Sequence, residues 1–367
     1  MKYERKEGCA LKQLITVGLI FGGCSAEHDV SILSAKAIAQ NINRSCYDVV
    51  PVYVDKCGKW YITNETLEIS KLDEQQVWLS MDPERPGLKM ENDGGVFIFP
   101  IDVFFPIIHG PYGEDGHLQG LLKISGIPFV GSGVASSVIG MDKEYMKMIF
   151  KKESIPVVDY LVFRNNGDWN MHKAITSVEE TFGFPCFVKP CNMGSSIGVT
   201  KVSDSSKLQE AIEVAFTHDR KVIVEKAVNA REIECAILGD NEPKASVLGE
   251  IIPNSEFYSY NVKYYSDQAK LIIGADLDPG ISDKIREIAV RVHKTIGCYD
   301  FSRVDFFLDK ESDAVWVNEI NTVPGFTDKS MYFKLWEATG LNFGELIDRL
   351  IHLTLERETM NRSMCIK

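Results

Sequence analysis

The chain has no long apolar run, no excess of positive charge and no closely paired cysteines. None of its apolar runs approaches the roughly 20 residues of a membrane-spanning helix, so we expect no membrane partner. The net charge of −12 argues against general nucleic-acid binding, which usually requires a basic surface. Nine scattered cysteines without a C-x-x-C motif fit reduced thiols and a cytoplasmic protein better than disulfides or a zinc site.

Two common nucleotide-binding signatures are also missing. The sequence contains no Walker A loop, Gly-x-x-x-x-Gly-Lys-Ser/Thr. The turn Gly22-Gly23-Cys24-Ser25 lacks the G-x-G-x-x-G pattern, which makes an NAD-dependent dehydrogenase the least favoured alternative. Basic residues before Leu14–Phe21 loosely resemble a lipoprotein signal, but about eight apolar residues are few for a signal core. We therefore predict a buried first strand.

The N-terminal part has the pattern of an open α/β domain. An apolar strand is predicted at Ile15–Phe21, helical spacing at 30–42 and a second strand at Val49–Val54. Strand, helix and strand in this order predict a right-handed βαβ unit. Residues 63–95 look polar and irregular, and another apolar strand is expected at Val103–Ile108.

The rest of the chain has the pattern of an α+β protein. Helices and short strands alternate up to about residue 226, and residues 231–252 look like two long strands. A polar, tyrosine-rich loop is expected at 254–270, followed by a helix at Asp278–Ile296. An apolar hairpin and two helices complete the prediction. The length of 367 residues fits two or three domains.

Residues 303–325 contain the clearest candidate for a metal site. Asp305 lies in one apolar strand, and Glu319 and Asn321 lie two residues apart in the next. Alternate residues of a strand share a face, so a hairpin would bring three oxygen ligands together. Mg²⁺ prefers such ligands where it also holds nucleotide phosphates. The alternative is a solvated polar face, which the surrounding Val, Phe, Trp and Ile residues disfavour.

Three weaker motifs point towards nucleotide and substrate binding. Lys189 precedes the small-residue turn Gly194–Gly198, which could cradle phosphates but could equally be a plain hairpin turn. A strand is expected to end at Glu225, and a short connector after it leads to a second strand that contains Glu232. Backbone groups at this hinge could bind adenine and Glu232 could bind a ribose, although exposed Glu and Lys residues at strand ends are usually solvated. Glu27 follows Gly22-Gly23 at the start of a helix, and an ordinary helix-start carboxylate is the simpler interpretation.

Taken in order, the motifs GGxSAE, HGxxGEDGxLQG, MDK, Lys-Pro…GSSxG, Glu-Lys and RVDF…NEINTxPG resemble the D-alanine–D-alanine ligase family of ATP-grasp enzymes. The resemblance runs from about Ile15 to about Leu355. It implies an ATP-grasp fold with three domains, at residues 1–131, 132–222 and 223–367. It also implies two Mg²⁺ ions, for which Mn²⁺ could substitute, and a homodimer that binds no nucleic acid.

By this resemblance, ATP phosphorylates the first D-alanine, and the amine of the second D-alanine attacks the resulting D-alanyl phosphate. Asp305, Glu319 and Asn321 match the family's Mg²⁺ ligands. The residues that match contacts to ATP are Lys143, Lys189 and Lys263 at the phosphates, Ser196 in the phosphate loop, Glu225, Lys226 and Val228 at the adenine, and Glu232 at the ribose.

The resemblance also assigns the residues that handle the amino acids. Those that match the family's substrate residues are Glu27 at the first ammonium with Ser195 and Tyr264 beside it, His109 near the same substrate, Arg303 and the Gly325 backbone N–H at the developing oxyanion, and Ser330 at the second carboxylate. Met193 departs from the pattern, because many members have an acid there, which puts the loop contacts in doubt.

The identity of the second substrate is the finer question. Relatives that use D-lactate lack the tyrosine that matches Tyr264, and relatives that use D-serine tend to read His-Ser-Arg where this chain reads Lys329-Ser330-Met331. An apolar Met331 suits a methyl group, so the resemblance favours D-alanine and a role in peptidoglycan precursor synthesis. The alternatives are a D-alanine–D-serine or D-lactate ligase of the glycopeptide-resistance type, another ATP-grasp carboxylate–amine ligase, and a non-catalytic nucleotide-binding protein.

Overall fold

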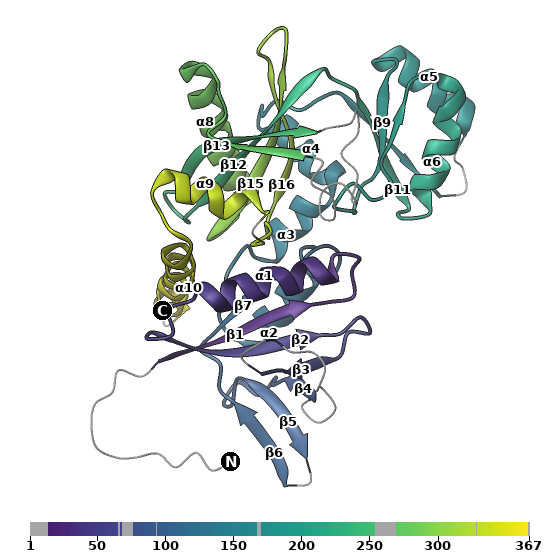
Figure 1. The fold of residues 1–367 in the computed structure, drawn as a ribbon. Coiled ribbons are helices and arrows are strands. Elements are labelled where there is room, and N and C mark those ends of the chain that lie inside the picture. The colour runs from purple at the N-terminus through teal and green to yellow at the C-terminus, as the bar shows by residue number, and fades with distance from the viewer. Residues whose placement is uncertain are drawn as a thin grey trace.

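A computed structural model describes residues 14–64, 67, 76–92, 94–166, 170–253, 269–327 and 329–365. Three β-sheets follow one another along the chain, formed by β1–β7, β8–β11 and β12–β16 (Figure 1). The seven cysteines whose state is described all carry free thiols, as expected. No helix in these ranges is long and apolar enough to cross a membrane.

The first sheet has the strand order β6-β5-β4-β3-β2-β1-β7. Its strands are β1 (Ile15–Gly22), β2 (Tyr47–Val54), β3 (Trp60–Ile62), β4 (Gln76–Leu79), β5 (Leu88–Asn92), β6 (Gly95–Phe99) and β7 (Val103–Pro106). β1 lies parallel to β2 and to β7, and α1 (His28–Asn41) connects β1 to β2. The expected βαβ unit is therefore present, and the position of β1 between two parallel neighbours explains its continuous apolar sequence.

The expectation that residues 63–95 are irregular was wrong. β4, β5 and the start of β6 lie there and extend the first sheet by antiparallel pairing. Much of β5 and β6 is exposed or only half-buried. A strand with little burial needs no regular alternation of apolar residues, which is why the sequence pattern did not reveal it.

The second sheet has the order β10-β9-β11-β8. Its strands are β8 (Tyr160–Arg164), β9 (Cys186–Pro190), β10 (Thr200–Val202) and β11 (Lys221–Lys226). The helices α5 (Met171–Thr181) and α6 (Leu208–Phe216), preceded by a 3₁₀ turn at Ser205–Lys207, cover one face through a core that includes Val188 and Val224. Lys189 and Glu225 belong to the opposite face, since neighbouring residues of a strand alternate between faces.

The third sheet has the order β14-β13-β12-β15-β16. Its strands are β12 (Ala230–Leu238), β13 (Lys244–Pro253), β14 (Ala269–Ile273), β15 (Phe301–Asp309) and β16 (Val315–Asn321). α8 (Pro279–Thr295) covers the face that carries Ile233 and Val304, and α9 (Met331–Thr339) packs on the other face over Ala236. Glu234, which follows the same alternation as Ala236, shares the second face.

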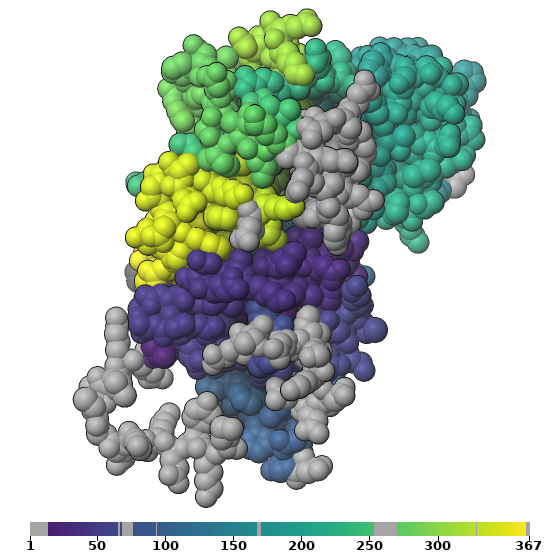
Figure 2. Space-filling model, viewed as in Figure 1, coloured from purple at the N-terminus to yellow at the C-terminus, as the bar shows by residue number. Residues whose placement is uncertain are grey.

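The remaining helices are α2 (His117–Ser125), α3 (Val134–Met141), α4 (Lys143–Lys152) and α10 (Phe343–Cys365). α10 packs against α1 and β7, and the largest hydrophobic core joins the first sheet to the third. At this junction the rings of Phe105, Phe301, Phe326 and Tyr332 lie with neighbouring centroids 5.6–6.1 Å apart. Figure 2 shows the purple N-terminal part directly against the yellow C-terminal helices, while the teal second sheet projects to one side.

The division into domains at residues 131 and 222 stays a prediction. β11 itself spans residue 222, and the side chains of Met146 and Phe150 from α4 belong to the core of the third sheet. α4 therefore packs with the C-terminal part although it precedes the second sheet in sequence.

Candidate active site

A polar face of the β15–β16 hairpin forms the centre of the candidate site. Across the two strands Arg303 pairs with Asn321, and Asp305 pairs with Glu319. The expected hairpin is therefore present, and its alternation places the four side chains on one face. Arg303 donates a hydrogen bond of 2.7 Å to each carboxylate oxygen of Asp305, and the Asn321 amide donates one of 3.0 Å to Asp305 Oδ2.

Arg303 is a buried cation between two acids. Its Nε lies 2.7 Å from Asp305 Oδ1 and 3.1 Å from Glu234 Oε2, and the residue is only 6% exposed. Burial alone would lower the pKa of Arg303, but Asp305 and Glu234 raise it well above its ordinary value. The guanidinium therefore stays charged, and Glu234 and Asp305 fix its orientation.

The chemistry of the donors on this face suits a hard divalent cation. Asp305 and Glu319 supply carboxylate oxygens, and Asn321 uses its amide nitrogen towards Asp305, which leaves its oxygen for a metal ion. No group of three or more His, Cys, Asp or Glu side chains that could hold a metal occurs among the described residues. The candidate metal site has two carboxylates, Asp305 and Glu319, and its third donor is the amide of Asn321.

Lys143 connects these carboxylates to the small-residue loop. Asp142 caps α4 by accepting hydrogen bonds from the backbone N–H groups of Glu144 and Tyr145, so the helix begins at Lys143. Lys143 Nζ donates a 2.8 Å hydrogen bond to the Met193 carbonyl and lies 3.7 Å from Glu319 Oε2. The third sheet and the loop after β9 therefore meet at one ammonium group.

The small-residue loop has an unusual backbone. Ser195 and Ser196 have φ angles of 51° and 59°, in the left-handed region that few non-glycine residues adopt. Strained conformations of this kind cluster at ligand-binding sites. This backbone favours a binding loop over a plain hairpin turn, and its contact with phosphates stays a prediction.

Two lysines share the carboxylate of Glu225. Lys189 Nζ lies 2.6 Å from Glu225 Oε2, and Lys147 Nζ, from α4, lies 3.0 Å from Oε1. Burial would raise the pKa of Glu225, but Lys147 and then Lys189 lower it to about 2. Glu225 is therefore ionised and almost fully covered, and its side chain is not on an open surface.

The expected strand–connector–strand arrangement follows Glu225. β11 ends at Lys226, whose side chain is exposed, and β12 begins at Ala230. Val228 lies half-buried in the connector, and Glu232 lies half-buried opposite Phe307. The contacts of these residues with adenine and ribose stay a prediction.

Glu27 stands where the first sheet meets the loop of the second. Ser195 Oγ donates a hydrogen bond to Glu27 Oε1, and the Glu27 backbone N–H donates to Ser25 Oγ at 3.1 Å. Ser25 in turn donates to the His109 carbonyl at 2.6 Å. Gly110, with a φ of 75°, fits here because a Cβ atom would lie 2.5 Å from Glu27 Oε2. Glu27 is only 6% exposed.

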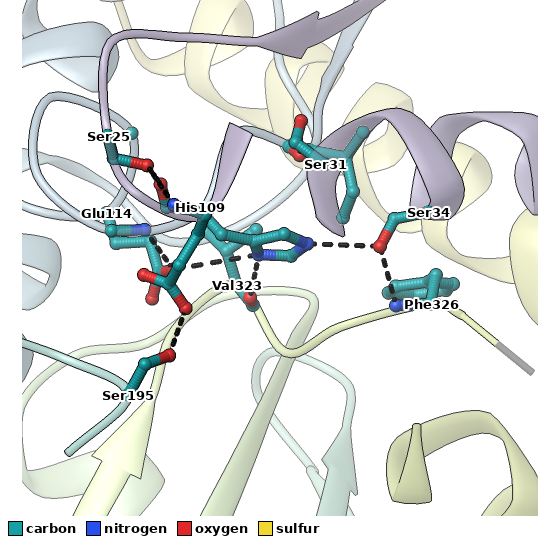
Figure 3. A network of polar contacts seen from close by, with 12 residues as sticks. Ser25, Ser31, Ser34, His109, Glu114, Ser195, Val323 and Phe326 are labelled. Carbon is teal, nitrogen blue, oxygen red and sulfur yellow. Dashed lines mark hydrogen bonds and ion pairs between the residues drawn. The ribbon is translucent and has the colours of Figure 1, made fainter. Parts of the chain in front are cut away.

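His109 links this region to the end of the third sheet (Figure 3). Its Nδ1 lies 3.1 Å from the Val323 carbonyl and its Nε2 3.1 Å from Ser34 Oγ. An N–H at Nδ1 donates to the Val323 carbonyl, and the Ser34 hydroxyl can form the second hydrogen bond at Nε2. Glu114 lies 3.6 Å from Nδ1, and its buried surroundings raise its pKa although His109 partly opposes the shift.

The segment after β16 contains the remaining candidates. A Cβ atom at Gly325 would lie 2.7 Å from Ser330 Oγ, and Ser330 Oγ accepts a 3.0 Å hydrogen bond from the Thr327 N–H. Met331 is 3% exposed, and its sulfur would lie 2.7 Å from a Cβ at Gly249. Met331 thus packs in the core between α9 and β13. Its contact with a second substrate stays a prediction.

A single pocket collects many of the predicted residues. Its lining includes Glu27, His109, Gly110, Glu114, Lys143, Gly194, Ser195, Arg303, Glu319, Asn321 and Gly325. Lys189, Ser196, Glu225, Lys226, Val228, Glu232, Asp305, Ser330 and Met331 do not line it. Lys263 and Tyr264 lie outside the described residues.

Three charged residues of the site were not singled out from the sequence: Lys147 and Glu234, which are buried, and Glu114, which is half-buried. Glu114 stood inside the quoted HGxxGEDGxLQG motif, so its position was visible but its role was not. Lys147 follows Lys143 by four residues, a spacing that places both on one face of a helix. Glu234 lies opposite Asp305 in the neighbouring strand, which no local pattern reveals.

Comparisons with known proteins agree with this geometry. A family model described as "D-ala D-ala ligase N-terminus" matches residues 16–132, and one described as "D-ala D-ala ligase C-terminus" matches residues 149–352. A D-alanine–D-alanine ligase of Heliobacterium modesticaldum is 44% identical over 347 residues, which cover 93% of this chain and 95% of that protein.

Solved structures of D-alanine ligases are also similar to this chain. The D-alanine-D-alanine ligase from Coxiella burnetii matches with a TM-score of 0.84 at 30% identity, covering 96% of this chain and 98% of its own. The VanG D-Ala:D-Ser ligase from Enterococcus faecalis matches with a TM-score of 0.83 at 36% identity, covering 93% and 100%. The predicted ATP-grasp fold is thereby confirmed, and the dehydrogenase alternative is not favoured. The chain belongs to the D-alanine–D-alanine ligase family, whose members are ATP-dependent ligases.

Proposed function

We propose that this protein joins two D-alanine molecules to form D-alanyl-D-alanine, in a reaction that converts ATP into ADP and phosphate. The observation that carries the proposal is the pocket in which Glu27 and Ser195 face Lys143, Arg303 and Glu319. An acceptor for an ammonium group, cations for phosphates and a donor for an oxyanion meet there. Relatives with the name D-alanine–D-alanine ligase align with nearly the whole chain.

The first D-alanine binds through its ammonium group to Glu27. The carboxylate of Glu27 is oriented by Ser195 and by the turn that Ser25 and His109 stabilise. A buried carboxylate with fixed hydrogen bonds recognises an ammonium group better than a mobile surface residue does, because its orientation is set before binding. Tyr264, outside the described residues, completes this site in the proposal.

In the first step a carboxylate oxygen of D-alanine attacks the γ-phosphorus of ATP. The bond from that phosphorus to its bridging oxygen breaks, ADP leaves, and D-alanyl phosphate forms. Phosphoryl transfer is accelerated chiefly by positioning and by compensation of negative charge. Lys143 and Lys189, with Ser196 and Lys263, hold the phosphates. Lys226, Val228 and Glu232 hold the adenosine.

Asp305, Glu319 and Asn321 would hold two Mg²⁺ ions, which Mn²⁺ could replace. When bound, these ions neutralise charge on the transferred phosphoryl group. The residues fit this role, since all three present hard oxygen atoms from one face of the hairpin and Arg303 fixes the position of Asp305.

In the second step the amine of the second D-alanine attacks the acyl carbon, and phosphate departs with the former carboxylate oxygen. Negative charge develops on the carbonyl oxygen as the amine adds. Arg303 and the Gly325 backbone N–H donate hydrogen bonds to this oxyanion, and donors that are already fixed stabilise it most effectively. Ser330 holds the carboxylate of the second D-alanine.

A D-alanine–D-serine ligase is the alternative with a specific observation behind it, namely the likeness to the VanG structure. Met331 no longer helps to decide between the two, because its side chain packs on Gly249. The preference for D-alanine rests on the relatives with that name, such as the Heliobacterium enzyme.

The test measures ADP release from ATP with D-alanine as the only amino acid, and identifies the products by mass spectrometry. Parallel incubations contain equal D-alanine and D-serine, or D-alanine and D-lactate, at neutral pH. D-Alanyl-D-alanine should dominate in each. A dominant mixed product would contradict the substrate assignment, and an absence of D-alanine-dependent ADP release would contradict the activity.

We further propose a homodimer in the cytoplasm that supplies a peptidoglycan precursor. The relation to the D-alanine–D-alanine ligase family supports the dimer, the cytoplasmic location and the role in precursor synthesis. Sedimentation of the purified protein tests the dimer, and restoration of growth in a bacterium depleted of its own ligase tests the cellular role.

A further inference from the structure

A fully buried lysine, Lys147, has no role in the reaction as described. It lies on α4, one helical turn after Lys143, so the two side chains leave the same face of the helix. Lys143 reaches the loop carbonyl of Met193 and approaches Glu319 of the third sheet, whereas Lys147 reaches Glu225 of the second sheet. The helix thus presents one cation towards the phosphate loop and another beneath the nucleotide site.

Lys147 shares its nearest acid with a second lysine. Lys147 and Lys189 share the carboxylate of Glu225, at 3.0 Å and 2.6 Å. A buried ammonium group is costly, and burial accordingly lowers the pKa of Lys147. Lys189 is half-buried, and Glu319 adds a smaller favourable charge interaction to each lysine. Glu225 is therefore the main acid for both cations, and a further anion would be bound favourably beside them.

The ligand that the proposed function places here is an anion. Lys189 faces away from the helices α5 and α6, on the same side of the second sheet as Glu225. With Glu225 as its partner at 2.6 Å, Lys189 has to leave or share that carboxylate when a phosphate arrives. How easily it does so depends on whether Glu225 has another cation beside it.

We propose that Lys147 is a positioning residue for nucleotide binding: it shares the carboxylate of Glu225 and so leaves Lys189 available to a nucleotide phosphate. The inference rests on the proposed function, in which Lys189 contacts ATP. Without Lys147, Glu225 would lose the cation at its Oε1, and Lys189 would be held more strongly at Oε2. Lys147 itself does not touch the nucleotide.

The first experiment replaces Lys147 by methionine, a side chain of similar length without the charge. Lys147→Met should raise the KM for ATP by about 10- to 100-fold, the range typical when a group that orients a ligand-binding side chain is lost. The KM for D-alanine should change far less. Lys152→Met is the matched control, because Lys152 lies on the same helix but is exposed. It should leave both constants unchanged.

A double-mutant cycle separates positioning from simple structural support. If Lys147 acts by sharing Glu225, its removal should matter little once that charge is absent. Lys147→Met should therefore raise the KM for ATP in the wild-type background but change it by less than about twofold in a Glu225→Gln background. Equal increases in both backgrounds would overturn the proposal. If Lys147→Met alone does not fold, the comparison of Glu225→Gln with the double variant still decides, because a rise of more than about twofold there would overturn the proposal.

Inhibition by ADP and by adenosine gives a second readout. Because the proposed effect passes through the phosphate contact of Lys189, Lys147→Met should weaken inhibition by ADP about tenfold or more while inhibition by adenosine stays nearly constant. Equal weakening of both would overturn the proposal, since it would place the effect at the adenine. If the wild-type protein shows no D-alanine-dependent ADP release, the proposed function has failed. If the wild-type protein releases ADP in the presence of D-alanine and Lys147→Met leaves the KM for ATP unchanged, only the inference about Lys147 has failed.

Discussion

A buried histidine away from the pocket gives a prediction whose size follows from its contacts. His293 of α8 accepts a 2.7 Å hydrogen bond at Nδ1 from Ser302 Oγ and donates one of 3.1 Å from Nε2 to the Gly239 carbonyl. One acceptor and one donor define the neutral ring, and protonation of Nδ1 would break the bond from Ser302. Burial lowers the pKa of His293 from 6.5 to about 4.

The direction of the pH effect follows from this pKa. The unfolded chain binds a proton at His293 below pH 6.5, whereas the folded protein binds it only near pH 4. Stability is therefore full above pH 6.5, falls as the pH drops towards 4, and changes no further below that. Linkage gives a loss of about 2 kcal/mol in the free energy of unfolding between pH 7.5 and pH 5 from this group.

Urea unfolding at these two pH values tests the prediction. Other groups titrate in the same range, so the quantity of interest is the difference in pH dependence between wild type and His293→Gln. The variant should lose about 2 kcal/mol less on acidification, whatever its stability at pH 7.5. His352→Gln, at an exposed position, is the control and should behave like the wild type. An unchanged pH dependence in His293→Gln would refute the assignment of a buried neutral ring.

Three further predictions concern the site and its support. Glu319→Gln should abolish D-alanine-dependent ADP release without unfolding the protein, and near-normal turnover would remove Glu319 from the metal site. Ser195→Ala should raise the KM for D-alanine by about tenfold, because Glu27 loses an orienting hydrogen bond; an unchanged KM in steady-state assays would argue against that role. Met331→Ala should lower the free energy of unfolding by about 2–5 kcal/mol in urea titrations, and a loss below about 1 kcal/mol would contradict its core position.

The parts of the site that the sequence predicts are those that depend on short-range spacing. The common face of Glu319 and Asn321 follows from the two-residue period of a strand, and Asp305 joins them because a short polar turn closes the hairpin. The connector after Glu225 is likewise local. None of these needs knowledge of a partner far away in the chain.

The residues that were missed depend on contacts between distant segments. Lys147 becomes informative only when α4 lies against the second sheet, next to Glu225, 78 positions later in the sequence. Met331 was singled out as a substrate residue, but its packing against Gly249 could not be predicted, because that contact joins two segments far apart in the sequence. The strands β4 to β6 were not predicted for another reason: weak burial leaves little alternation of apolar and polar residues in their sequence.

The contacts of the site also explain why its function belongs to the chain as a whole. Ser195 to Glu27 joins the second sheet's loop to the first sheet, Lys143 joins that loop to α4 and the third sheet, and His109 joins the first sheet to Val323 after β16. Each of these contacts crosses between separate parts of the fold. A shift of one sheet would therefore disturb Glu27 and Lys143 together, the residues proposed to bind the ammonium group and a phosphate. It follows that neither the segment 16–132 nor the segment 149–352 holds a complete site, even though each matches a family model of its own.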